Sequence, residues 1–539
     1  MTNQPAFDFV PPWETGRPSL YEYIQSHKNG GELPVEGMAL PDDERYAQTA
    51  THNVVWGPGG LDGMISHHTL ATPNRETLDA FDRAIRRLLA NPNAASIADL
   101  YALAVGEGNL LTIIDDLKQR IYDAPPGNLD LLHDFAYWLA TSSPDRNLVK
   151  IGIALLGVFT TPHDEELLTL GLHDEFTLYA LIALQGGNTP EQAESLAWDL
   201  AQRVHGWGRV FAVEHLAQSV NRDIKRWLVR EGYRNSVMIE YVAYPCAAGG
   251  ELAAQLRVLT DDGMAVPEPD KLLIGAVEIL TAFFNGSPSG GMVGYEEGAE
   301  AVELLLSLME TAGWGDPRFL LFAAGLRDFV ADAEQNWDAL EADGWTEEKK
   351  RDMAERASAF MARPEWPGTL SPLLEKTSAP GFALAATAAE RLGIDTWPYR
   401  FRRQRDLAAD AESDEWSRLL ETTDPERLNE VLRLAEQKVD LAAVELGVDT
   451  EPEVGPFRFD ALDNILYGLQ PFPGKGWNFV RASLRSPIVR RRNLALQALA
   501  AWDRFVWPDD AENELRRMQD VETDEFARKR LQLLLGHSD

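Results

Sequence analysis

Apolar residues recur every three to four positions along most of this chain, in runs of about 10–16 residues joined by short connections. This spacing is typical of amphipathic helices. The first run places on one face Leu78, Phe81, Ile85, Leu88 and Leu89, and ends at Asn91-Pro92. Because the connections are only a few residues long, neighbouring helices must pack antiparallel, as helical hairpins.

The same pattern predicts many further helices, whereas strand signals are scarce. The short apolar segments 54–56 and 256–259 have no alternating partner. The expected helices cover 95–105, 109–122, 129–142, 146–159, 164–171, 173–185, 190–205, 269–284, 295–311, 317–332, 346–362, 425–437, 457–468, 487–501, 509–520 and 523–535. We therefore expect an all-α fold, built as an α-solenoid of antiparallel helix pairs.

The first 75 residues differ from the rest because proline and glycine are frequent and helical periodicity is weak. Only short helical turns are expected, over 20–25 and 42–49. Such a segment is most simply irregular chain held against a larger body. We therefore expect residues 1–75 to form an irregular N-terminal arm.

The charge balance limits the partners that this chain can have. It carries 85 acidic and 50 basic residues, a net charge of −35. Such a surface repels phosphate backbones and anionic membranes, so neither non-specific nucleic-acid binding nor membrane docking is expected. The single cysteine, Cys246, allows no intramolecular disulfide and no cysteine-based zinc site, and it fits a reducing compartment. No secretory signal is visible at Met1, and we expect a cytoplasmic protein.

A local pattern recurs at four places, where a helix of a pair is expected to begin. A small or apolar residue is followed by a basic residue, and a further small or apolar residue comes three positions after the basic one. The four places are Val149-Lys150 with Ile153, Gly208-Arg209 with Ala212, Val489-Arg490 with Asn493 (the poorest fit), and Ala527-Arg528 with Leu531. The basic side chain is expected beside the turn, while the apolar residues pack on the preceding unit.

Two of these openings carry a family resemblance. They read Asp145-Arg146-Asn147-Leu148-Val149-Lys150 and Ser486-Pro487-Ile488-Val489-Arg490. In these segments the chain resembles HEAT-type (armadillo-like) helical-repeat proteins, over 140–260 and 457–536. The resemblance implies a scaffold that binds protein partners on a concave face. It suggests four parts: the arm at 1–75, a first helical-repeat region at 76–260, a helical middle region at 261–405 and a C-terminal HEAT-like region at 406–539.

A second resemblance is confined to residues 207–243. The segments Trp207-Gly208-Arg209-Val210, Trp227-Leu228-Val229-Arg230-Glu231-Gly232-Tyr233-Arg234-Asn235 and Glu240-Tyr241-Val242-Ala243 carry it. They are similar to uncharacterised bacterial helical-repeat proteins, some of which are labelled limonene hydroxylase. The residues give that label no support, since a cysteine-ligated haem would need Cys246 and no flavin-binding fingerprint follows a strand.

Histidines are unevenly distributed, with nine of the ten in the first 215 residues. If the arm folds over the first repeats, it can meet His173-Asp174-Glu175 or Glu214-His215. Two or three imidazoles and a carboxylate would then suit a transition metal with an open position. The candidate metal ligands are His52, His67, His68 and His173. The alternative is that they cap helices or hydrogen-bond to backbone, since no tight motif is present.

Two further groups of residues are candidates for binding. The first, a glycine-rich segment, lets the backbone approach a ligand closely, but no phosphate-loop strand, Lys-Ser/Thr pair or following helix is evident. Its candidate ligand contacts are Gly57, Gly59, Gly60 and Asp62. The second group, arginines from two basic clusters, suits an acidic partner or a phosphorylated ligand, unless neighbouring carboxylates neutralise it. Its candidates are Arg402, Arg403, Arg490 and Arg491.

Two functions fit these patterns. The first is a cytoplasmic helical-repeat scaffold that binds a protein partner, without catalysis and without an expected cofactor. The second is a metal-dependent or small-molecule site where the arm covers the first repeats, with a transition metal as the possible cofactor.

Overall fold

The computed structural model divides the chain into two compact units, Met1–Ala362 and Arg363–Asp539. The described residues are 9–14, 16–49, 56–69, 74–107, 109–260, 267–286, 291–311, 315–408, 411, 413–445 and 460–536. The four-part division expected from the sequence is finer than these two units. The two units differ in their charge balance. Residues 1–362 carry 54 acidic and 26 basic side chains, whereas residues 363–539 carry 31 acidic and 24 basic side chains.

Regular structure within the described ranges is helical. They contain no strand, and only an isolated antiparallel bridge joins Asn29 and Glu32. The segment 256–259, considered as a strand signal, lies inside helix α15 (Leu252–Thr260). The prediction of an all-α fold is therefore confirmed. None of the described helices combines the length and the apolar character that crossing a membrane requires.

The arm contains more helix than its sequence suggested. The two expected short helices are present as α1 (Leu20–His27) and α2 (Asp43–Thr49). A third, α3 (Gly60–His68), follows the glycine-rich segment directly. The expectation that no helix follows these glycines was therefore wrong. Gly59 caps α3 through its left-handed backbone (φ 68°) and not through a side chain, so the helix lacks the usual sequence signal.

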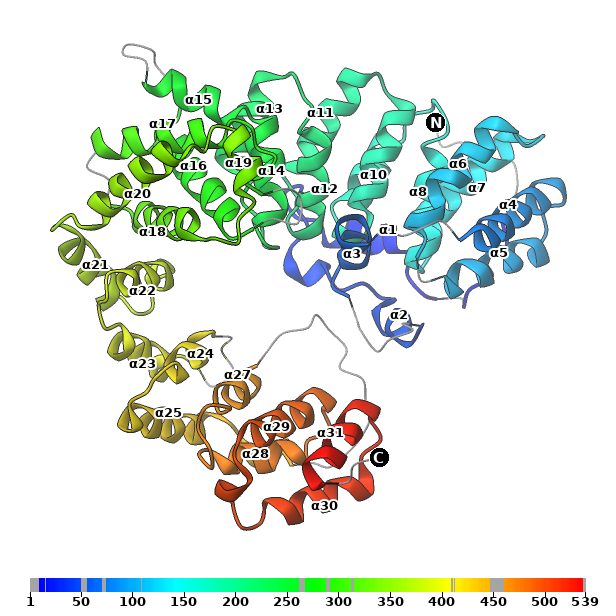
Figure 1. Ribbon diagram of the computed structural model, residues 1–539. Helices are drawn as coiled ribbons and strands as arrows, with labels where there is room; N and C mark the ends of the chain where they lie inside the picture. Colours follow the sequence, from blue (N-terminus) through cyan, green and yellow to red (C-terminus); the bar gives the residue numbers. More distant parts are fainter. Residues whose placement is uncertain are drawn as a thin grey trace. The chain divides into compact units, whose positions relative to one another are not determined.

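The rest of the first unit is a stack of antiparallel helices (Figure 1). Its helices are α4 (Arg75–Ala90), α5 (Ala94–Gly106), α6 (Leu111–Asp123), α7 (Leu129–Ser142), α8 (Arg146–Leu156), α9 (Asp164–Gly171), α10 (Asp174–Gly187), α11 (Pro190–Ala201), α12 (Gly206–Leu216), α13 (Arg222–Trp227), η2 (Leu228–Gly232), α14 (Glu240–Gly249), α15, α16 (Pro269–Phe284), α17 (Gly298–Thr311), α18 (Pro317–Ala331), α19 (Trp337–Ala342) and α20 (Glu347–Met361). One layer runs through α8, α10, α12, α14, α16, α18 and α20, each packed on the next. We call α4–α20 the stack.

Local sequence explains where these helices begin and end. Asn74 caps α4 by accepting from the backbone N–H groups of Glu76 and Thr77, and Asn93 forms a capping box with Ser96 at the start of α5. Helices α7, α9 and α16 cover the predicted ranges 129–142, 164–171 and 269–284. Strong periodicity and clear caps therefore made these elements predictable.

The second unit is a smaller set of packed helices. They are α21 (Trp366–Glu375), α22 (Phe382–Arg391), α23 (Trp397–Asp406), α24 (Glu415–Leu420), α25 (Pro425–Lys438), α26 (Leu441–Val444), α27 (Ala461–Gly468), α28 (Trp477–Leu484), α29 (Val489–Ala501), η3 (Arg504–Val506), α30 (Ala511–Val521) and α31 (Glu525–Leu535). Its apolar core includes fully buried Ile465, Phe479 and Leu531. The last helix, α31, packs on α29 and α30.

Candidate functional site at the junction of arm and stack

Lys150 lies at the centre of a buried cluster of charges where the arm meets the stack. Its Nζ lies 2.8 Å from Asp62 Oδ2 and 2.6 Å from Glu175 Oε1. Asp62 belongs to arm helix α3, and Glu175 to the first turn of α10. The hydroxyl of Tyr179 donates to the other oxygen of Asp62 at 3.2 Å. All four side chains are buried, so the cluster is closed to bulk water.

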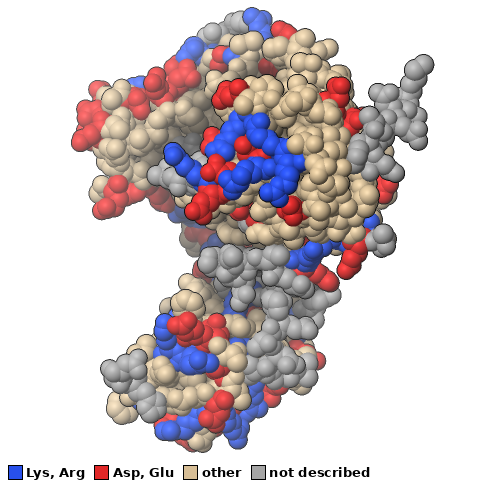
Figure 2. Space-filling view, turned by 90° about the vertical axis from the view of Figure 1, so that its right-hand side faces the viewer, with Lys and Arg blue, Asp and Glu red and all other residues tan. Residues whose placement is uncertain are grey.

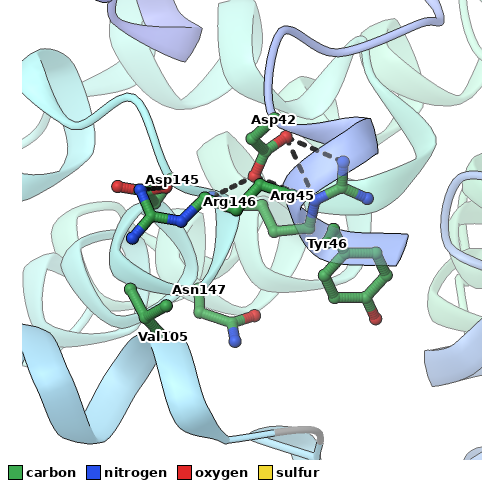
Figure 3. Close-up of a pocket in the computed structure, with 7 residues that line it drawn as sticks. All are labelled: Asp42, Arg45, Tyr46, Val105, Asp145, Arg146 and Asn147. Carbon is green, nitrogen blue, oxygen red and sulfur yellow. Dashed lines mark hydrogen bonds and ion pairs between the residues drawn. The ribbon is translucent and has the colours of Figure 1, made fainter. Parts of the chain in front are cut away.

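Arg146, one turn earlier on α8, makes a second set of contacts with the arm (Figure 3). Its guanidinium donates to Asp42 at 2.7 and 3.1 Å, and its backbone N–H donates to the same carboxylate at 2.8 Å. Asp43 accepts a further bond from it. The ring of Tyr46 lies 4.2 Å from the guanidinium carbon, a cation–π contact. The start of α8 is thus held by α2 and the residue before it.

A third contact completes the attachment of the arm. Arg17 donates to both oxygens of Asp145, at 2.9 and 3.1 Å, and to the carbonyl oxygen of Pro144 at 2.9 Å. Asp145 occupies the N-cap position of α8 but makes no capping bond with its side chain, because Arg17 and Tyr101 take its oxygens. Arm positions 17, 42 and 62 therefore bind stack positions 145, 146 and 150 in the same order.

The charges of the cluster do not cancel. Three buried carboxylates, Asp42, Asp62 and Glu175, face two buried cations, Arg146 and Lys150. Burial acts to raise the pKa of Glu175, but the two cations outweigh it and lower that pKa to about 2. Burial raises the pKa of Asp62. Asp62 is therefore the carboxyl of this pair that binds a proton more readily.

The geometry leaves little room for a substrate in this cluster. A cavity of about 20 Å³ beside Arg146 is lined by Arg45, Tyr46, Val105 and Asn147, among others. That volume suits about one water molecule. Buried ion pairs add little stability but fix which surfaces meet. We therefore interpret the cluster as the attachment of the arm to the stack.

The glycine-rich segment brings the arm backbone against the stack. The N–H of Gly59 donates to Glu175 Oε2 at 3.0 Å, and a Cβ there would lie 2.7 Å from the carbonyl oxygen of Asp174. Gly57 and Gly60 close a turn through a 2.8 Å backbone bond. The candidate ligand contacts Gly57, Gly59, Gly60 and Asp62 thus lie in the attachment, with Asp62 paired to Lys150.

The structure brings two of the predicted histidines together. His67 and His68 end α3, where the Nε2 of His68 lies 2.7 Å from the hydroxyl of Tyr241 and the Nε2 of His67 lies 3.5 Å from Glu214 Oε1. The rings of Trp207 and Tyr241 lie 5.7 and 5.2 Å from that of His67. The arm therefore meets both segments that the sequence suggested, at Glu175 and at Glu214.

His173 lies in a different environment, where both ring nitrogens have backbone partners. Nδ1 accepts from the N–H of Glu175 at 3.2 Å, and Nε2 donates to the carbonyl oxygen of Met38 at 3.1 Å. Burial lowers the pKa of His173 to about 4. His52 lies outside the described residues. In the part of the chain that the structure describes, no three His, Cys, Asp or Glu side chains are gathered to hold a metal.

A groove between α12 and α14 lies beside the His67–Glu214 contact. Its volume is about 400 Å³, and Glu214, Gln218, Tyr244, Pro245 and Gly249 contribute to its walls. Burial raises the pKa of Glu214 to about 7 and lowers the pKa of His67. Both groups are thereby shifted toward their neutral forms. The groove thus contains an acid that titrates near neutrality.

Replacing Glu214 with glutamine is expected to flatten the dependence of stability on pH. The pKa of Glu214 is about 7 in the folded chain and ordinarily 4.5, so the folded state binds the extra proton between these pH values. Its contribution is present below about pH 4.5 and is lost as the pH rises through 7. Partial exposure limits the loss to about 1 kcal/mol. Urea denaturation of the unchanged protein and of Glu214→Gln at pH 5 and pH 8 measures this loss of stability. If both proteins lose the same stability between the two pH values, the raised pKa of Glu214 is contradicted.

The candidate partner-binding arginines of the second unit pair with nearby carboxylates. Figure 2 shows such mixing of basic and acidic side chains on one face of the molecule. The pairs are Arg402 with Glu375 at 2.8 Å, Arg403 with Glu415 at 3.5 Å, Arg490 with Asp463 at 2.7 Å, and Arg491 with Asp460. The alternative interpretation, helix-face charges neutralised by neighbouring acids, matches these contacts. Arg492, the next residue of α29, has a fully buried side chain that pairs with Glu522.

The sequence pattern did not predict the residues that attach the arm to the stack. Lys150 was interpreted as a side chain beside a turn, and Asp42 and Arg146 were not considered as partners. One signal was present, because Lys150 stands between Val149 and Ile151 in a helix whose other faces are apolar. A lone charge in such surroundings indicates a buried partner.

No family model, curated protein or solved structure matches this chain. Cys246 is buried in α14, and burial raises the pKa of its thiol above the ordinary value.

Proposed function

We propose that this chain is a cytoplasmic helical-repeat scaffold that binds a protein partner through the end of its second unit. The observation that carries the proposal is a set of large apolar side chains exposed on the last helices. Phe505, Val521, Phe526 and Leu533 are 97%, 53%, 78% and 75% exposed. We call these four residues the terminal apolar surface. Exposed apolar side chains of this size are typical of binding surfaces.

The charges of α31 indicate the chemistry of the partner. Phe526 and Leu533 are seven residues apart and share one face of the helix, with Lys529 and Arg530 between them. A second copy in antiparallel register would place these cations against each other, which opposes self-association. The complementary partner is an amphipathic helix with acidic residues between two apolar anchors.

Replacing Phe526 and Leu533 with serine is expected to abolish partner binding. Truncating a central apolar anchor typically costs about 2 kcal/mol or more, which lowers affinity at least about 30-fold for each of the two residues. Both side chains point away from the core, so the fold should persist. Co-purification from source cells, quantified by mass spectrometry, measures the loss. The matched control is Val35→Ser, which alters a side chain that is 85% exposed in the first unit. A partner retained equally by both variants would contradict the proposal.

A second candidate is a small-molecule site in the groove between α12 and α14. The observation that favours it is Glu214, an acid whose pKa of about 7 suits proton exchange or the binding of a small cation. Glu214→Gln separates the two functions, because it removes this acid and leaves the terminal apolar surface intact. Partner binding should survive this substitution if the scaffold proposal holds.

A further inference from the structure

Two histidines outside the arm face each other in the first unit. His133 lies on α7 and His163 at the N-cap position of α9, and their Nε2 atoms are 2.8 Å apart. The ring of Phe159 packs edge-on against that of His133 at 5.1 Å. At this distance one imidazole donates an Nε2–H bond to the Nε2 of the other, so two nitrogens that can bind a metal lie next to each other.

The ring of His163 is diverted from the usual role of its position. An N-cap side chain normally accepts from the backbone of the first turn, as His173 does at α10. His163 makes no such bond and contacts His133 instead. Helix capping therefore does not explain the orientation of this ring.

The surroundings resemble those of a metal-binding imidazole. The Nδ1 of His133 lies 3.5 Å from Asp134 Oδ1, so a carboxylate stands on the side opposite the converging nitrogen. Metal-bound histidines commonly have such a partner, which orients the ring and raises its basicity.

A third donor lies next to the pair. Glu166 follows His163 by three residues in the first turn of α9. It accepts a 3.0 Å hydrogen bond from the hydroxyl of Tyr137, which lies one turn after His133 on α7. The rings of Tyr137 and His163 are 5.1 Å apart. Glu166 is thus held beside the two histidines by a single exposed hydrogen bond.

We propose that His133, His163 and Glu166 form a binding site for a divalent transition-metal ion such as Zn²⁺. Tetrahedral Zn²⁺ with bonds of about 2.0–2.1 Å needs its two nitrogens roughly 3.4 Å apart. Binding therefore releases the proton between the two Nε2 atoms, separates the rings by about half an ångström and turns both lone pairs toward the ion. The three donors are not yet gathered in the described structure. On metal binding, the carboxylate of Glu166 therefore leaves its hydrogen bond with Tyr137 and coordinates the ion. Two imidazoles and one carboxylate leave a coordination position open.

Titration of the metal-free full-length protein with Co²⁺ and Zn²⁺ tests this site. We expect one ion per chain by calorimetry and a Co²⁺ visible spectrum that Zn²⁺ abolishes. His133→Gln and His163→Gln should each lower affinity at least about tenfold. Tyr137→Phe should leave affinity equal or higher, because it releases Glu166. The matched controls are His68→Gln and His215→Gln, which should bind as the unchanged protein does.

Three results would overturn the proposal. They are no binding at about millimolar ion, binding undiminished in His163→Gln, and binding lost only in His68→Gln. Circular dichroism melts check the fold of each variant. If His163→Gln does not fold, Glu166→Gln replaces it, because this half-exposed side chain can change without disturbing the core. Undiminished binding in a folded Glu166→Gln protein would then contradict the three-donor site.

Discussion

Replacement of Lys150 with methionine is expected to destabilise the first unit by about 3–5 kcal/mol. The substitution removes the cation between Asp62 and Glu175 and leaves two buried carboxylates facing each other. Their repulsion and lost solvation outweigh the apolar packing that methionine retains. The arm should detach first, because Asp62 is one of the three arm residues that bind the N-terminal half of α8 and its cap. Urea denaturation and limited proteolysis of the arm measure both effects.

A matched substitution separates this effect from a general cost of losing a lysine. Lys271 pairs with Glu231 and Glu268 at the surface, where its side chain is 46% exposed. Exposed pairs contribute at most about 1 kcal/mol, so Lys271→Met should change stability little. Equal stability of the Lys150→Met and Lys271→Met proteins would show that the buried cluster does not hold the arm.

The corresponding change in the second unit is Arg492→Met. Arg492 donates to both oxygens of Glu522 at 2.7 and 2.8 Å and to the carbonyl oxygens of Ser486 and Pro487. Both charged side chains are fully buried. Removing the guanidinium leaves an unpaired buried carboxylate and two carbonyl oxygens without donors. We expect a loss of about 3–5 kcal/mol, confined to the second unit.

Hydrogen exchange followed by mass spectrometry checks this prediction unit by unit. In Arg492→Met, protection should fall in α29 and α30 and should be unchanged in α8 and α10. Arg516→Met is the control, because Arg516 is 59% exposed and pairs only along its own helix with Glu512. Equal protection in the Arg492→Met and Arg516→Met proteins would contradict the structural role of Arg492.

The helices were predictable because their sequence signals are local. Periodic apolar residues and caps such as Asn93 depend only on neighbours within a few positions, so α7, α9 and α16 were placed correctly. Helix α3 was missed because a glycine with a left-handed backbone begins it, and its stability comes from packing on Trp207.

The attachment of the arm depends on contacts that no local pattern encodes. Asp42 and Arg146 are separated by more than a hundred positions, and so are Gly59 and Glu175. The uneven distribution of histidines suggested that the arm, if folded over the first repeats, could meet the segment of Glu175 or that of Glu214. It could not indicate that Lys150 pairs with Asp62 and Glu175, since pairing of buried charges is decided by tertiary packing.

The measurement that tests the scaffold proposal most directly is zero-length cross-linking of protein isolated from its source cells. A carbodiimide joins the Nζ of Lys529 to a carboxylate only when the two are in contact. The account predicts an intermolecular link from Lys529 to an aspartate or glutamate of a different protein, absent when Phe526 and Leu533 are serine. A link to a second copy of this chain, or only the intramolecular link to Glu525, would contradict it.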